Sequence, residues 1–103
     1  MKEETKNSVH KKISYSEEDK KKTLEAFFSE GKLVTLPSKE KRKVIIFIEL
    51  IKLFKKDILY SEKEVNDVLK NVYDDFAIIR RYLIDYKLLE RSVDGEAYWV
   101  NKS

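Results

Sequence analysis

The sequence predicts an α+β fold that is mostly helical. Between residues 60 and 86 apolar side chains recur at helical spacing, and after Leu88 the period changes to that of two short strands. One proline and two glycines in 103 residues leave few turns for an all-β architecture. The order helix, turn, helix, hairpin is the outline of a winged helix-turn-helix. We therefore expect this layout, with a small antiparallel sheet and an extra N-terminal helix.

The first helix of this unit is predicted by a capping box. Ser61 is followed three residues later by Glu64, so each side chain can accept a hydrogen bond from the other residue's backbone N–H. Apolar residues at helical spacing then give the helix one buried face. These are Val65, Val68, Leu69 and Val72.

The second helix is expected from residue 74 to residue 86. Asp74 or Asp75 can cap its start, because a carboxylate accepts the unpaired N–H groups of a first turn. Its inward side is predicted to hold four residues at i, i+3, i+7 and i+10. These are Phe76, Ile79, Leu83 and Tyr86.

A hairpin is predicted to follow this helix. Residues 89–93 and 96–100 are expected to form its strands, and Asp94-Gly95 can adopt the positive φ values of a type I′ turn. The short apolar piece from Leu33 to Leu36 is expected to pair with this hairpin and complete a three-stranded sheet, because two strands alone are marginally stable.

The N-terminal part is predicted to consist of a flexible charged tail and one helix. Residues 1–15 are polar and contain the single histidine, His10; residues 16–103 are expected to form a single winged-helix domain. Within it, the N-terminal helix is expected over 16–30 and the core over 32–101. Ser16 is predicted to start that helix, and Gly31 to end it as a C′ residue.

A further helix is expected from Lys39 to about Phe54, with Ser38 as its cap. Residues 44–54 are apolar almost all round, which indicates a central helix with two buried faces. Phe27 and Phe28 of the N-terminal helix can cover the second face. The alternative is a homodimer through residues 44–54 or through the N-terminal helix.

Composition limits the classes of function. The chain has no cysteine and no stretch long enough to span a membrane, so we expect a cytoplasmic protein without disulfides and without membrane contact. The predicted folded region has no histidine, no glycine-rich phosphate loop and no Ser-His pair. We therefore expect neither an enzyme nor a bound cofactor or metal.

The charge is distributed unevenly along the chain. Residues 32–60 carry eight Lys and Arg against three acids, a balance of +5, whereas residues 61–103 carry seven against nine, a balance of −2. The basic excess therefore lies upstream of the predicted helix-turn-helix. This distribution keeps two functions open: binding of nucleic acid and binding of another protein.

The stretch from about Leu24 to Val100 contains a set of short motifs. They are Phe27-Phe28, Gly31-Lys32-Leu33, Leu36-Pro37, Lys39, Lys41-Arg42-Lys43, Phe54, residues 60–66, Asp75, Arg80-Arg81, Asp94-Gly95 and Tyr98-Trp99. In these motifs the chain resembles bacterial domain-of-unknown-function family 2087, in which some members are described as transcriptional regulators of winged-helix type. The resemblance implies a DNA-binding or regulatory role. Where family members usually have a glycine before the hairpin, this chain has Lys87.

These considerations predict a double-stranded DNA interface. Arg81, with Arg80 and Ile78, is expected to reach bases from the recognition helix, because arginine pairs with guanine in the major groove. Arg80 can equally form an ion pair with a carboxylate of the preceding helix. Predicted phosphate contacts are Lys39, Lys41, Arg42, Lys43 and Arg91. The alternative is a protein-protein interaction module on the same scaffold, which the acidic hairpin tip favours.

Overall fold

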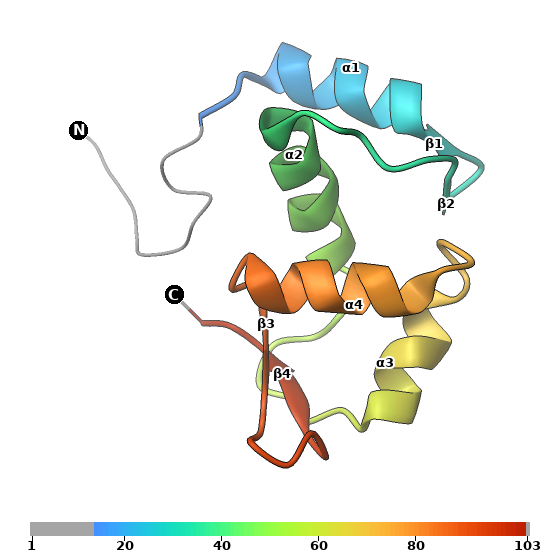
Figure 1. The fold of residues 1–103 in the computed structure, drawn as a ribbon. Helices are drawn as coiled ribbons and strands as arrows, with labels where there is room; N and C mark the ends of the chain where they lie inside the picture. The colour runs from blue at the N-terminus through green and yellow to red at the C-terminus, as the bar shows by residue number, and fades with distance from the viewer. Residues whose placement is uncertain (1–13, 103) are drawn as a thin grey trace.

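The computed structural model describes residues 14–102 and is mostly helical (Figure 1). The predicted tail and His10 lie almost wholly outside the described residues. The order of elements is consistent with a winged-helix-like layout, as predicted. The elements are α1 (Glu17–Phe27), β1 (Phe28–Ser29), β2 (Lys32–Leu33), α2 (Glu40–Ile51), α3 (Glu62–Leu69), α4 (Phe76–Asp85), β3 (Leu89–Arg91) and β4 (Tyr98–Val100).

Side-chain caps start three of the four helices. Ser61 and Glu64 form the predicted capping box of α3, and Asp75 accepts a hydrogen bond from the Ile78 N–H at the start of α4. Ser16 caps α1 as predicted, with Asp19 as its reciprocal partner. At α2 the prediction of Ser38 is wrong: the cap position is Lys39, whose side chain makes no capping bond.

The tight two-residue turn occurs between β1 and β2, and not in the C-terminal hairpin for which the sequence predicts it. α1 ends at Phe27 and not at residue 30, because Phe28 is already extended and pairs with Leu33. The prediction of Gly31 as the C′ residue of this helix is therefore wrong: Glu30 and Gly31, with φ values of 53° and 80°, form a tight two-residue turn between β1 and β2. At the second hairpin only Gly95 has positive φ, so Asp94-Gly95 is not a type I′ turn. The strands there are shorter than predicted, and residues 92–97 form a loop in which the Gly95 N–H donates to the Ser92 carbonyl.

Tyr60, and not residues 33–36, pairs with the C-terminal hairpin as its third extended segment. The prediction that residues 33–36 complete a three-stranded sheet is wrong. The tight turn at Glu30-Gly31 folds Leu33 back onto Phe28, and the Leu33 N–H donates to the carbonyl of Val72. Tyr60 instead bridges Tyr98 of β4 in antiparallel fashion.

The core surrounds α2. Residues 44–47 of this helix are at most 2% exposed, and α1 packs against α2 through side chains that include Leu24 and Phe27. The predicted cover by the N-terminal segment is therefore present within one chain, and residues 44–47 offer no surface to a second copy. None of the helices in residues 14–102 is long and apolar enough to span a membrane.

Lys87 ends α4 in the left-handed conformation. Its φ is 63°, its N–H donates to the Ile84 carbonyl, and the Leu88 N–H donates to the Leu83 carbonyl. These two bonds are the pattern of a Schellman motif, which glycine usually completes at this position. Lys87 adopts the backbone geometry that glycine usually has at this position, and its Cβ makes that geometry sterically unfavourable.

We expect Lys87→Gly to raise the free energy of unfolding by about 1 kcal/mol, because glycine has no Cβ to clash at positive φ. Urea unfolding monitored by circular dichroism measures the change. Lys87→Ala is the matched control, since it removes the same exposed side chain but retains the Cβ. An equal gain from both variants would show that the lysine side chain, and not the backbone, is the source of the cost.

Candidate nucleic-acid interface

The outward face of α4 (Ala77, Ile78, Arg81 and Asp85) follows from the way the helix is packed. Ile79 and Leu83 are fully buried on the inward side, as predicted. The Arg81 side chain is 83% exposed, and its Nε atom lies 4.0 Å from Oδ2 of Asp85, one turn further along. An exposed ion pair of this length contributes little to stability, so the guanidinium is available to a ligand.

The first turns of α2 lie beside the C-terminal half of α4. The Tyr86 hydroxyl donates a 2.7 Å hydrogen bond to Oε2 of Glu40. Burial and this hydrogen bond raise the pKa of Tyr86, so its hydroxyl stays protonated. Lys43 Nζ lies 5.3 Å from the ring centroid of Tyr82, within cation–π range. A hollow of about 250 Å³ opens on this side, lined by Ile78, Arg81, Tyr82 and Asp85.

The predicted basic cluster (Lys39, Lys41, Arg42 and Lys43) is divided between two sides of α2. Lys41 Nζ forms a 3.0 Å ion pair with Asp19, which lowers the pKa of that carboxyl, and Arg42 lies 5.8 Å from the Phe27 ring centroid. Both therefore face α1. Lys43 faces α4, and Lys39 is exposed one turn before it, where its carbonyl accepts the Lys43 N–H.

Arg80 points to α3 and away from the open surface. Its Nη1 donates to Oδ1 of Asn66, and its Nη2 lies 3.5 Å from Oε2 of Glu62. Only 22% of the Arg80 side chain is exposed. The two neighbouring arginines thus differ. Arg80 joins α3 and α4 and forms the alternative ion pair with a carboxylate of the preceding helix, whereas Arg81 faces solvent.

Ile78 and Arg91 each lie in a mixed position. Ile78 is half-buried and packs against the core from the edge of the outward face. Arg91 is exposed at the end of β3, and its guanidinium folds over the hairpin loop, where a Cβ at Gly95 would lie 3.1 Å from Nη1. Beside it, hydrogen bonds from Ser92 and the Glu96 N–H lower the pKa of Asp94, so the hairpin tip stays anionic.

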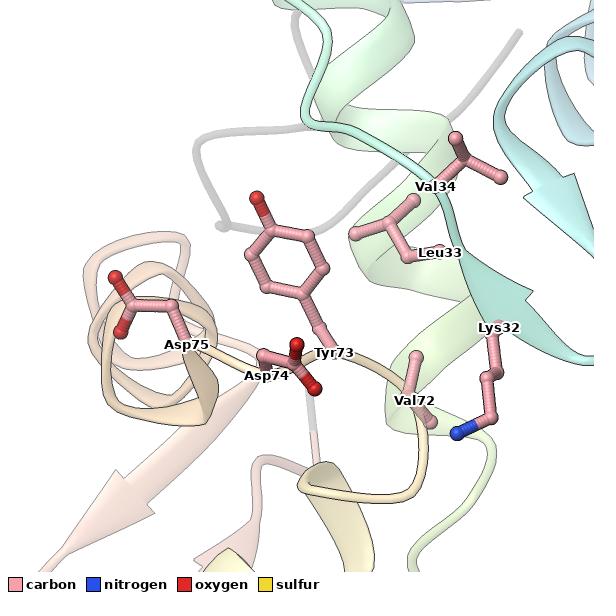
Figure 2. A pocket seen from close by; sticks show the side chains of 7 residues that line it. All are labelled: Lys32, Leu33, Val34, Val72, Tyr73, Asp74 and Asp75. Carbon is pink, nitrogen blue, oxygen red and sulfur yellow. The ribbon is translucent and has the colours of Figure 1, made fainter.

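A second hollow, of about 330 Å³, lies where β2 meets the turn between α3 and α4. Figure 2 shows Lys32 of β2 on one side of it and Asp74 and Asp75 on the other. The sequence did not indicate that Lys32 lines this hollow. It also did not indicate that Tyr82 lines the hollow on α4. Lys32 reaches its position through the long-range bond from Leu33 to Val72, which has no local signal.

The helices, the hairpin and the outward face of α4 define a small α+β domain of winged-helix-like layout. The chain matches the family of domain of unknown function 2087, described as an uncharacterized protein conserved in bacteria, over residues 32–100, and it belongs to that family. No curated protein and no solved structure matched this chain.

We expect Arg80→Ala to lower the free energy of unfolding by about 1–2 kcal/mol, because it removes a half-buried charged hydrogen bond and an ion pair between α3 and α4. Arg81→Ala, on the same helix, is the matched control and should change it by less than about 0.5 kcal/mol. Urea unfolding of the two variants gives the comparison. Equal destabilisation would contradict the assignment of Arg80 as the structural member of the pair.

Proposed function

We propose that this chain is a cytoplasmic, non-enzymatic bacterial protein that binds double-stranded DNA, as a transcriptional regulator or as an accessory to one. In this proposal α4 enters the major groove, which has the width of one α-helix. The observation that supports it most is the position of Arg81, on the outward face of α4 and 83% exposed.

Arg81 and Ile78 supply the proposed base contacts. The Arg81 guanidinium presents paired donors suited to O6 and N7 of guanine, and Ile78 lies three residues earlier along the same helix. Arg80 is engaged with α3, so in this proposal it positions α4 and touches no base.

Lys43 and Lys39 are the proposed phosphate contacts on the side of α4, and Arg91 contributes from the hairpin. Lys41 and Arg42 contribute less, because their contacts with Asp19 and Phe27 turn them toward α1. Asp85 on the outward face repels phosphates and so opposes close approach of the DNA backbone at the C-terminal end of α4.

We expect fluorescence anisotropy with random-sequence duplex DNA to show binding at low salt that weakens steeply near physiological salt, since phosphate contacts release counterions. Lys43→Gln should weaken all sequences alike and reduce the slope of log K against log salt by about 1. Lys22→Gln is the matched control, because it removes the same charge from an exposed position on α1. Absence of binding at low salt would refute the proposal.

Arg81→Ala should relax sequence preference and leave salt-dependent binding to random duplex in place. After selection of preferred duplexes, we expect wild type to lose about 1–3 kcal/mol when one guanine is replaced, and Arg81→Ala to lose far less. Lys39→Gln is the matched control, since it removes a charge near the same face without removing a base contact. A preference unchanged in Arg81→Ala would move base recognition elsewhere.

The second candidate function is a protein-protein interaction module without direct DNA binding. The acidic residues beside the hollow of Figure 2, Asp74 and Asp75, and the anionic hairpin tip favour it. Both features would repel DNA but could receive a basic segment of another protein. Failure of the chain to bind duplex DNA at low salt would favour this second candidate function over DNA binding.

A further inference from the structure

Two consecutive large apolar residues are exposed on the connection between α2 and α3. Leu59 is 70% exposed and Ile58 is 42% exposed. With Trp99 and Val100 of β4 they line a hollow of about 340 Å³, rimmed by the ion pair between Asp57 and Lys102. Single exposed apolar residues are ordinary, but a contiguous group at the margin of a sheet indicates an interaction surface.

The backbone beside this group is an open sheet edge. Tyr60 exchanges two 2.8 Å hydrogen bonds with Tyr98, so its N–H and carbonyl point toward β4. Because these groups alternate along an extended chain, those of Leu59 point to the opposite side. Within residues 14–102 the N–H and the carbonyl of Leu59 make no hydrogen bond. The connection passes beside the hairpin, where Tyr60 bridges Tyr98 of β4 (Figure 1).

We propose that a second copy of this chain pairs antiparallel with this edge, with Leu59 facing Leu59 across a two-fold axis. In that register each Leu59 N–H donates to the other copy's Leu59 carbonyl, and Ile58 lies opposite Tyr60. The two hairpins and the two edge segments (residues 58–60) then form one continuous sheet. The exposed leucines meet at its centre.

Charge complementarity selects a second copy as the occupant. Lys56 precedes the edge segment and Glu62 follows it, so an antiparallel two-fold arrangement directs the basic flank of each copy toward the acidic flank of the other. Lys56 is exposed, and half of the Glu62 side chain is exposed. The left-handed turn at Asp57, with φ of 66°, and the start of α3 at Glu62 end the extended stretch, so these charges lie at its margins and not within the strand pairing. An unrelated peptide would have to supply both charges and the apolar centre, whereas this chain already carries them.

Sedimentation velocity over a range of concentrations tests the proposal, which does not depend on DNA binding. We expect wild type to form a dimer, and Leu59→Arg to remain monomeric over the same range. Leu53→Arg is the matched control, because Leu53 is 50% exposed just after α2 and lies outside the edge. A monomeric wild type, or loss of the dimer in both variants, would overturn the proposed edge.

A charge exchange tests the two-fold register itself. Lys56→Glu and Glu62→Lys should each weaken self-association about tenfold, because the axis doubles every unfavourable contact. An equimolar mixture of the two variants should recover the dimer, since each chain then presents the charge that the other requires. Circular dichroism checks that Glu62→Lys, which loses its ion pair with Arg80, remains folded. Failure of the mixture to recover the dimer would overturn the register, and an edge that binds only an unrelated peptide would overturn the choice of occupant.

Discussion

The contact between Phe47 of α2 and two tyrosines of α4 determines how α4 is presented. Phe47 is fully buried; its ring stacks on that of Tyr82 at 5.0 Å and lies tilted against that of Tyr86 at 5.4 Å between centroids. Aromatic pairs of this kind are worth about 1 kcal/mol beyond the area they bury, and their geometry restricts rotation of one helix against the other. With the inward side of α4 held in this way, Arg81 is left on the solvent side and Lys43 is brought over Tyr82.

Local signals predicted the starts of α1, α3 and α4 and the buried faces of α3 and α4, but not the cap of α2. Ser16, Ser61 and Asp75 cap helices because their side chains accept hydrogen bonds from N–H groups three residues further along, and such contacts depend only on nearby sequence. Turn type was predicted less well. Gly31 and Gly95 both have positive φ, but that property fits a helix end, a tight hairpin turn and a longer loop equally. The partner of each strand depends on contacts far apart in the chain, such as Tyr60 with Tyr98.

The candidate site was predictable in its residues but less so in its arrangement. Helical spacing separates Arg80 from Arg81 by about 100°, so the two side chains face different directions. For Arg80 the sequence left open a choice between a carboxylate of the preceding helix and DNA, and the packing of α3 against α4 places it beside Glu62 and Asn66. The basic cluster shows the same limit. Whether Lys41 faces α1 or α4 depends on Asp19, 22 positions earlier, which only the packing of α1 brings close.

The covering of α2 by α1 has a practical consequence for recombinant expression. The matched region begins at residue 32, so a polypeptide trimmed to the family boundary would lack Leu24 and Phe27. Apolar side chains of α2 against which α1 packs would then be exposed to water, and such surfaces promote aggregation. Aggregation of the trimmed polypeptide would reflect the missing cover and would say nothing about how the untrimmed chain assembles.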